Sequence, residues 1–357
     1  MFWRSVRHFV RLLAQGLKLL LYLLISTNPA PLFGQLPAIG VIDYYGVRHV
    51  SAELVRQGLQ IKLGDRLSES SMPEIVAGAK QRLEAISGVL HARLEFVCCG
   101  AGKTTLYVGI EEMGAPAPQF RAAPQGAVRL PAEIVGAGDA YQKATLEAVL
   151  KGDASEDDSQ GHTVSHSPAR RTIEERYIRF AARELVNLRD VLRNSADAGQ
   201  RALAAEVIGY APEKRVSAAD LEYGMLDPDS GVRNNAMRAL WVIAGFAQKH
   251  PELKIEIDPH PFVELLNSLY WTDRNKSSAA LMALAGQRDP ALLTDLRDHA
   301  LASLVEMARW KAEGHAYPAY IILGRIAGLS ETQISNAWDR NDRETVIAAA
   351  SKTASRD

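Results

Sequence analysis

The segment spanning residues 172–352 restricts the fold of this chain more than any other, because helical periodicity runs through nearly all of it. Apolar side chains recur three and four positions apart between Ile173 and Leu192, as on one face of an α-helix. Four later stretches each carry a small alanine face followed by a large apolar residue. Their anchoring alanines are Ala204, Ala236, Ala279 and Ala319, which lie 32, 43 and 40 residues apart. This spacing is typical of stacked helix pairs and predicts an all-α solenoid over residues 172–352.

One unit of this segment, residues 226–240, combines an acidic turn with a helix that has a small-residue face. Pro228 and the acids beside it are suited to ending one helix and capping the next. We expect Arg233 to bond back to Asp227 or to the counterpart of Asp227 in a neighbouring repeat. Small side chains on the helix would permit close packing. The repeat-motif residues are Asp227, Pro228, Asp229, Val232, Arg233, Ala236 and Leu240.

Residues 226–240 closely resemble a HEAT repeat, and the other units resemble it less closely. The resemblance extends over residues 172–352 and implies a HEAT-like α-solenoid that serves as a scaffold for protein interactions. A related helical repeat occurs in bilin-attaching lyases. A HEAT-like lyase therefore remains as the enzymatic alternative.

Residues 37–113 have the pattern of a separate, small α+β domain. A β-branched and aromatic strand is expected over residues 39–46, followed by helices that begin at Ser51 and Ser71. Two alternating strands come next, one over residues 92–99 that we expect to be half-buried and one over residues 106–112. The predicted element order is β-α-α-β-β, and a chain of 357 residues is expected to be multidomain.

This element order, together with the turn from Ile61 to Asp65, resembles a POTRA domain. Domains of that family belong to outer-membrane assembly, two-partner secretion and some cell-division proteins of the bacterial periplasm. The resemblance implies that residues 37–113 can capture another chain by pairing a free sheet edge with an incoming strand. The chain departs from the usual setting of the family because a helical pattern follows the small domain.

Residues 1–36 contain no Asp or Glu and place four basic residues ahead of an apolar stretch from Leu19 to Ile25. This is the pattern of a secretory signal peptide. The apolar stretch is much shorter than the roughly 20 residues of a membrane span. An uncleaved anchor at residues 9–25 and a buried or amphipathic cytosolic helix are alternatives. We expect a protein exported to the periplasm or anchored in the inner membrane, with membrane contact only through this segment.

Residues 114–171 are predicted to connect the two domains. Three prolines within residues 114–124 favour an extended, semi-stiff linker over a helix. A single helix is predicted over about residues 131–151, because Pro131 is suited to a helix start and Gly152 to its end.

Residues 153–169 contain acids, Ser, Gly, His and Pro without an apolar period, so we predict a surface loop. The acidic cluster consists of Glu156, Asp157 and Asp158. His162 and His166 lie in the same loop and have no Cys or further His nearby. We interpret both histidines as solvated loop residues rather than as metal ligands.

Residues 100–105 look like the end of a nucleotide-binding loop, but Val97 occupies the position where that pattern requires glycine. We therefore predict a hairpin turn. The only two cysteines of the chain, Cys98 and Cys99, are adjacent in the preceding strand. Neighbouring strand residues point to opposite faces, so we expect one buried and one more exposed thiol, with a vicinal disulfide as the alternative.

No catalytic, cofactor-binding or metal-binding set is predicted. The segments around His260, Arg274 and His299 contain acids and bases, but none brings a third partner at a recognisable spacing. Trp271 is interpreted as a core or groove aromatic. The formal net charge of -1 gives no field that favours nucleic acid.

The combined prediction is a non-enzymatic adaptor of the bacterial cell envelope, with no cofactor and no nucleic-acid partner. Its partner would be a protein or peptide, such as an outer-membrane or secreted protein. Binding would use the solenoid surface, the sheet edge of the small domain, or both. The alternative is a membrane-anchored cell-division or outer-membrane biogenesis factor. Residues 353–357 are predicted to be a tail.

Overall fold

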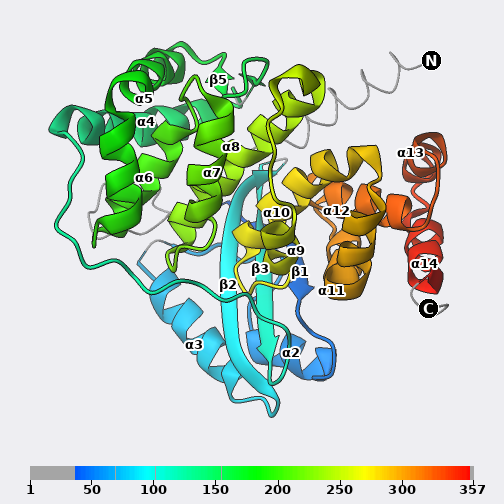
Figure 1. The fold of residues 1–357 in the computed structure, drawn as a ribbon. Helices are drawn as coiled ribbons and strands as arrows, with labels where there is room; N and C mark the ends of the chain where they lie inside the picture. The colour runs from blue at the N-terminus through cyan, green and yellow to red at the C-terminus, as the bar shows by residue number, and fades with distance from the viewer. Residues whose placement is uncertain (1–36, 69, 101, 154, 354–357) are drawn as a thin grey trace. The chain divides into compact units, whose positions relative to one another are not determined.

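The computed structural model of the protein describes residues 37–68, 70–100, 102–153 and 155–353, and the remaining residues are drawn as a grey trace in Figure 1. The segment interpreted as a signal peptide or anchor lies outside the described residues. The described residues form two compact units. Unit 1 contains residues 37–117, Asn267–Trp271 and residues 300–353, and unit 2 contains Pro118–Leu266 and Thr272–His299.

The C-terminal part of the predicted solenoid, residues 300–353, therefore belongs to the same compact unit as the small α+β domain. The boundaries drawn from the sequence, between the small domain and the linker after residue 113 and between the linker and the solenoid after residue 171, stay predictions. Among the helices that the structure describes, none is both long enough and apolar enough to span a membrane.

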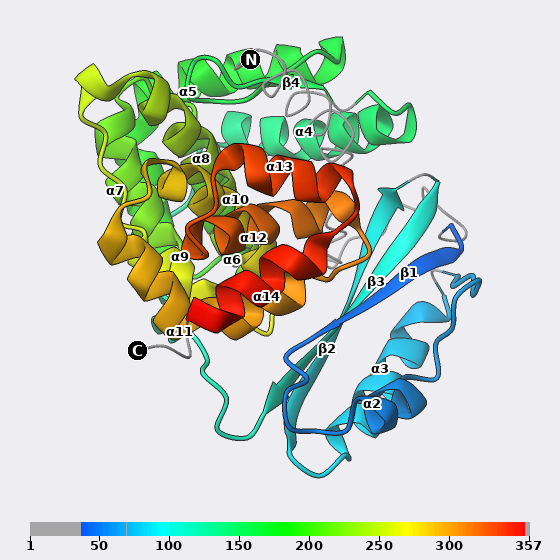
Figure 2. The same cartoon turned by 90° about the vertical axis from the view of Figure 1, so that its right-hand side faces the viewer.

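The small domain of unit 1 contains a three-stranded sheet whose elements follow the predicted β-α-α-β-β order. These elements are β1 (Ile39–Tyr45), α2 (Ala52–Leu59), α3 (Met72–Glu84), β2 (Val89–Gly100) and β3 (Lys103–Glu112). The strand order is β1-β3-β2, with β1 parallel and β2 antiparallel to the central β3. Figure 2 shows α2 and α3 together on one side of this sheet.

Alternate apolar residues of β3 build the core beneath those two helices. Leu106, Val108 and Ile110 are buried against Val55 of α2 and Leu83 of α3. The side chain of Ser51 caps α2 by accepting a hydrogen bond from the backbone N–H of Leu54, 3.4 Å away, as a residue at this position commonly does. The alternating pattern therefore fixes which sheet face meets the helices.

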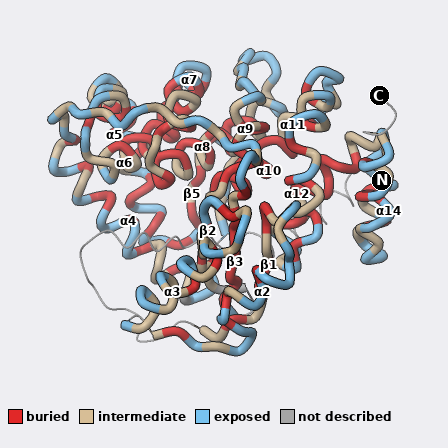
Figure 3. Tube along the Cα trace, turned by 90° about the horizontal axis from the view of Figure 1, so that it is seen from below, coloured by how far each residue is buried: buried red, intermediate tan, exposed pale blue. Residues whose placement is uncertain are grey.

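The opposite face of the sheet is also buried, so the expectation of a half-buried strand over residues 92–99 is wrong. Glu95 and Val97 of β2 are each only 6% exposed, and Tyr107 of β3 is fully buried. The run of buried residues along β3 is visible in Figure 3. Aromatic residues distant in the sequence cover this face, since the rings of Trp271 and Trp310 lie 4.7 and 5.0 Å from that of Tyr107.

Polar contacts join the same face to the C-terminal part of unit 1. The carboxylate of Asp43 accepts from the backbone N–H of Lys311 at 2.9 Å, and the backbone N–H of Gly46 donates to Glu306 at 3.0 Å. The hydroxyl of Tyr107 lies 2.6 Å from Nδ1 of His315. The C-terminal elements are residues 300–308 of α11 (Pro290–Ala308), α12 (Glu313–Ile326), α13 (Glu331–Asp339) and α14 (Arg343–Thr353).

Unit 2 is an array of stacked helices with one short hairpin. Its elements are α4 (Ala132–Leu150), β4 (Glu156–Asp157), β5 (Val164–Ser165), α5 (Pro168–Asn194), α6 (Ala198–Ile208), α7 (Lys214–Gly224), α8 (Ser230–Lys249), the 3-10 turn η1 (Pro251–Leu253), α9 (His260–Leu265), most of α10 (Trp271–Leu284), the 3-10 turn η2 (Ala285–Gln287) and the first part of α11. The helix predicted near residues 131–151 is confirmed as α4, with Pro131 directly before it.

The turn between β2 and β3 matches the prediction, whereas the state of Cys98 does not. Gly100 pairs with Lys103 across the β2–β3 turn, and Gly102 has a positive φ of 74°, so the predicted hairpin is confirmed. Cys98 is half-buried and disulfide-bonded, so the preference for a free thiol is wrong at this position. The side chain of Cys99 lies outside the description.

Candidate functional site

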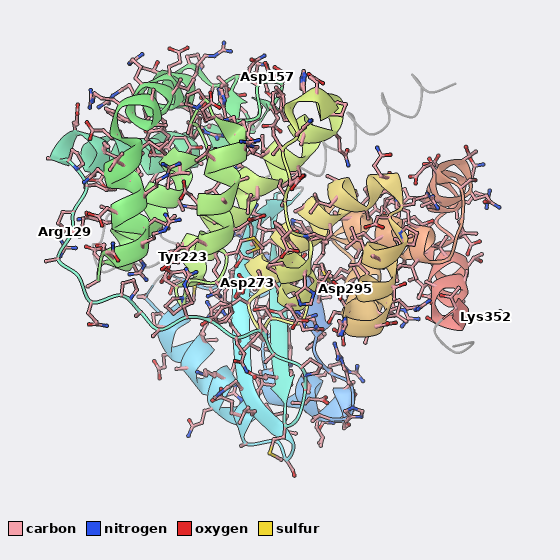
Figure 4. The ribbon with its side chains drawn as sticks, in the orientation of Figure 1. Arg129, Asp157, Tyr223, Asp273, Asp295 and Lys352 are labelled. Atoms are coloured by element: carbon pink, nitrogen blue, oxygen red, sulfur yellow. The ribbon has the colours of Figure 1, made fainter. Side chains whose placement is uncertain are left out.

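The predicted acidic surface loop contains a short hairpin in unit 2, and the first acid of its cluster, Glu156, is buried. Glu156 is in β4, which pairs with β5, and its side chain is only 5% exposed. Asp157, labelled in Figure 4, remains exposed beside it. Gly161 approaches Phe246 of α8 so closely that an added Cβ would lie 3.0 Å from the ring, which explains the glycine in this tight turn. The surface-loop interpretation is therefore wrong for Glu156.

Two arginines from different helices hold Glu156. Arg170 of α5 donates to its carboxylate at 2.7 Å, and Nη2 of Arg238 of α8 lies 2.8 Å from both of its oxygens. Arg170 also donates to Glu174 at 3.1 Å and to the hydroxyl of Tyr141 at 2.9 Å. Burial alone would raise the pKa of Glu156, but the two guanidinium groups hold it below the usual range. The carboxylate therefore stays ionised at neutral pH.

Next to this ion-pair group lies a small cavity, which we call the Glu206 cavity. It offers about 30 Å³ of space to water and is lined by Tyr141, His162, Thr163, Glu206, Gly209, Tyr210, Asn235, Arg238, Ala239 and Val242. Glu206 projects from α6 and is half-buried. Within the described residues, no hydrogen bond to its carboxylate is present.

The titratable groups around the cavity have shifted pKa values. Burial raises the pKa of Glu206 to about 7, although Arg238 and Arg170 act to lower it. Burial, assisted by the charge of Lys214, lowers the pKa of His162 to about 4, so its ring is neutral at pH 7. Burial also lowers the pKa of Lys214 to about 8. Such shifts concentrate at functional sites.

The size and side chains of the cavity limit its chemistry. A space of about 30 Å³ holds one or two water-sized groups, far less than a metabolite requires. In the part of the chain that the structure describes, no three His, Cys, Asp or Glu side chains form a group that could hold a metal ion. The cavity therefore suits the tip of a small polar or charged group.

The two loop histidines have different surroundings. His166 is exposed, as expected, and its Nδ1 lies 3.0 Å from the hydroxyl of Ser155. His162 is not a solvated residue, because its ring lies 5.5 Å from that of Tyr210 and its Nδ1 is 3.4 Å from the ammonium of Lys214. Sequence reasoning missed Glu206 because a single acid in an alanine-rich helix resembles an ordinary surface residue.

The repeat-motif residues lie at the turn between α7 and α8, where Asp229 caps α8 by accepting from Gly231 and Val232. Arg201 of α6 forms a two-point ion pair with the carboxylate of Asp227, at 2.8 and 2.9 Å. The other members of the motif, Pro228, Ala236 and Leu240, belong to the same turn and helix.

Arg233 continues this series of arginine–aspartate ion pairs to the next helical repeat. It donates to the backbone carbonyls of Asp227 and Pro228 and forms an ion pair with Asp273 of α10, which is labelled in Figure 4. Arg233 and Asp273 are both fully buried. The guanidinium of Arg233 also lies 3.8 Å from the ring of Phe120. The linker therefore packs onto the contact between α8 and α10, which we call the α8–α10 seam. Both bonding options expected for Arg233 are therefore present, one through a backbone carbonyl and one through an acid.

Two of the isolated bases of unit 2, His260 and His299, bond to the same acid, which sequence reasoning did not single out. Asp295, labelled in Figure 4, accepts from His260 at 3.0 Å and from His299 at 2.7 Å. The hydrogen bond with Asp295 raises the pKa of His260. Both histidine side chains are more than half exposed. The three side chains therefore form a hydrogen-bonded group at the surface of unit 2.

A second candidate site lies at the outer edge of β2 in unit 1. The backbone N–H of Ala92 donates to the carboxylate of Glu84 at 3.0 Å rather than to β3. The ladder from residue 91 to residue 97 is continuous, so outward-facing backbone groups recur at every second residue. Leu94 and Phe96 therefore direct N–H and C=O groups outward, and no described strand pairs with this edge.

The outer edge of β1 is bonded instead. Ile39 donates its N–H to the carbonyl of Asp65 and accepts from the N–H of Gly64, at 2.9 and 2.8 Å. Further along, the carbonyl of Ile42 accepts from the ammonium of Lys311 at 2.9 Å. These contacts block strand addition at β1, in the way that natural sheets protect their edges.

Comparisons with known proteins add little to these observations. No protein-family model matches the chain, and no curated protein matches it. Among solved structures, a designed armadillo repeat protein is similar over 52% of this chain and 94% of its own length, with 17% sequence identity and a TM-score of 0.30. A TM-score this low supports no inference about the present chain. The description of unit 2 as stacked helices rests on its own elements.

Proposed function

We propose that the protein is a non-enzymatic interaction scaffold that captures an extended segment of another protein at the outer edge of β2. The observation that carries this proposal is the difference between the two sheet edges. The backbone groups of Leu94 and Phe96 point outward, whereas β1 is bonded by Gly64, Asp65 and Lys311. Strand addition at β2 would satisfy backbone groups of both chains.

The setting we propose is the bacterial cell envelope, with a POTRA-like small domain and a HEAT-like solenoid. The basic and apolar pattern of residues 1–36 supports export. The β-α-α-β-β order and the open edge of β2 support the POTRA-like interpretation. The contacts that Asp227 and Arg233 make between successive helical repeats support the HEAT-like interpretation of the solenoid. The partner would then be an outer-membrane or secreted protein.

A proline substitution at Leu94 tests strand capture. Leu94→Pro removes an outward N–H without removing a bond to β3, whereas Leu94→Ala removes the same side chain and keeps the N–H. Peptides selected from a random extended library on the wild-type protein should bind Leu94→Ala and lose at least tenfold in affinity on Leu94→Pro. Hydrogen exchange should show peptide-dependent protection of residues 92–98.

Two results would contradict strand capture. One is equal peptide affinity for the proline and alanine variants while both retain the wild-type circular dichroism spectrum. The other is protection that appears on the helices of unit 2 and not on β2, because that would place the binding surface on the solenoid.

A further inference from the structure

The Glu206 cavity contains an acid whose charge has no dedicated partner. The carboxylates of Glu156 and Glu174 are bonded by Arg170, and Glu156 is bonded by Arg238 as well. Glu206 has only longer-range interactions with these groups. The two guanidinium groups are thus engaged by Glu156 and Glu174, and neither donates a hydrogen bond to the carboxylate of Glu206. A cation bound in the cavity would contact that carboxylate directly.

The nearby cations do not supply this charge by direct contact. The ammonium of Lys214 donates to the carbonyl of Gly209 at 2.9 Å and lies beside His162. Lys276 of α10 is buried, and its electrostatic partners are Arg238 and Glu156. The carboxylate of Asp158, beside the hairpin, accepts from the hydroxyl of Thr163 at 2.7 Å.

Aromatic rings form the walls beside Glu206. Tyr141 and Tyr210 line the cavity and are 8% and 6% exposed, and the neutral ring of His162 packs against Tyr210. Aromatic faces attract cations when water is excluded. A carboxylate among such rings favours an ammonium group, whose hydrogens can reach both the acid and the hydroxyl groups.

We propose that the Glu206 cavity binds the head of an alkylammonium group. The space of about 30 Å³ accommodates a nitrogen with one attached carbon, as at the end of a lysine side chain or in a small free amine. The recognising groups are the Glu206 carboxylate and the rings of Tyr210 and Tyr141. This site is in unit 2 and is independent of the β2 edge, so either proposal can fail without the other.

Binding should depend on pH because Glu206 must be ionised to accept the cation. The charged and titratable groups of the cavity and of the adjoining ion-pair group are Tyr141 of α4, Glu156, Asp158 and His162 of the hairpin segment, Arg170, Glu174 and Tyr177 of α5, Tyr210 after α6, Lys214 of α7, Arg238 of α8 and Lys276 of α10. An alkylammonium ion keeps its charge throughout the range from pH 6 to pH 8, since the pKa of a lysine side chain is about 10.4. With a pKa of about 7 for Glu206, affinity should rise roughly tenfold from pH 6 to pH 8.

Thermal unfolding of the full chain tests the proposal, with methylammonium chloride as the free-amine probe and sodium chloride at equal concentration as the control. A ligand that binds the native state raises the melting temperature in a saturable way. A short blocked peptide with one central lysine forms the second arm, compared with the same peptide carrying acetyl-lysine. Saturable binding in either arm supports the alkylammonium site, and the arm with the higher affinity identifies its source.

Glu206→Gln should abolish the methylammonium effect and its pH dependence. Glu175→Gln is the matched control, because Glu175 is exposed on α5 and should leave the effect unchanged. A second measurement covers the case in which Glu206→Gln does not fold. In the wild-type protein, carboxyl carbon NMR should show that methylammonium lowers the pKa of Glu206.

The proposal is overturned if methylammonium and sodium chloride act identically at every pH and neither lysine peptide binds. It is also overturned if a folded Glu206→Gln variant retains the effect, or if methylammonium leaves the pKa of Glu206 unchanged.

Discussion

Two buried carboxylates of unit 1, Asp43 and Glu112, accept hydrogen bonds from backbone amides, whereas Asp227 and Asp273 of unit 2 pair with guanidinium groups. Asp43 accepts from Lys311, and Glu112 accepts from the amides of residues 48–50 at 2.7 to 3.0 Å. In unit 2, by contrast, Asp227 and Asp273 are bonded by arginine side chains. Asp43 and Glu112 therefore fix the path of the backbone, while Asp227 and Asp273 join helix to helix.

The two units also differ in how far along the chain their contacts reach. Asp43 and Lys311 are 268 residues apart, and Gly46 and Glu306 are 260 residues apart. The ion pairs of Arg201 and Arg233 span 26 and 40 residues. These two ion pairs of unit 2 join helices that lie close together in the sequence, as in a solenoid. Unit 1 depends on the C-terminal helices for one face of its sheet.

Removal of residues 309–357 should produce the largest difference between the units. The sheet of unit 1 would lose Trp310, which is 1% exposed, together with the Lys311 contacts to Asp43. Loss of a buried tryptophan alone costs about 3–5 kcal/mol. Amide exchange in β3 should therefore accelerate on the order of 100-fold or more.

Hydrogen exchange followed by mass spectrometry checks this prediction, with α6 and α8 of unit 2 as the internal control. Unchanged protection of β3 in the truncated protein would show that the small domain folds without the C-terminal helices.

Arg233→Ala should have the next largest effect, this time in unit 2. It leaves the fully buried Asp273 without its arginine partner, which typically costs about 3–5 kcal/mol. Denaturant unfolding provides the measurement. Arg183→Ala is the control, because Arg183 is 53% exposed and pairs with Glu133 at the surface. A loss below about 1 kcal/mol for Arg233→Ala would contradict a tightly closed seam.

Tyr107→Phe should have a smaller effect in unit 1. The ring and its packing against Trp271 remain, while the 2.6 Å contact between the hydroxyl and His315 is lost. A net hydrogen bond contributes about 0.5–1.5 kcal/mol. Tyr44→Phe serves as the control at a half-buried tyrosine. Equal stability of the two variants in thermal unfolding would mean that the His315 contact contributes nothing.

Glu112→Gln should give the smallest effect, about 0.5–1 kcal/mol at pH 7. Burial acts to raise the pKa of Glu112, but the backbone N–H groups of Val50, Arg48 and His49 outweigh it and lower the folded-state pKa below 4.5. The contribution of the ionised carboxylate is therefore present above pH 4.5 and is lost as pH falls through the folded pKa. Unfolding curves of the two proteins should converge in acid, and a constant difference down to pH 2 would contradict this assignment.

Periodicity predicted the elements well because each depends on local spacing. The alternation of Leu106, Val108 and Ile110 correctly placed a strand with one face in the core. The other face was not predictable, because the residues that bury Tyr107 lie in segments 267–271 and 300–353. No local pattern signals such distant packing.

The candidate site was less predictable than the fold. The turn containing Asp227 was evident from its sequence. The structure shows that Asp227 bonds back to α6, whereas the side chain of Arg233 forms its ion pair with α10, so the two residues serve successive helix contacts. Glu156 looked like part of a solvated acidic cluster. Its burial depends on Arg170 and Arg238, which come from helices that the hairpin meets only in the folded chain.

The long separation between Asp43 and Lys311 has a consequence for protein synthesis. A ribosome adds about 5–20 residues per second, so the 268 residues between these positions require roughly 13–54 s. For most of that interval β3 has been made, while Trp310 and the C-terminal helices of unit 1 have not. A nascent chain of this protein therefore presents an incomplete sheet to the cell, and its first strand acquires its hydrogen bonds from Lys311 and Ala312 only once the chain has been translated to the start of α12.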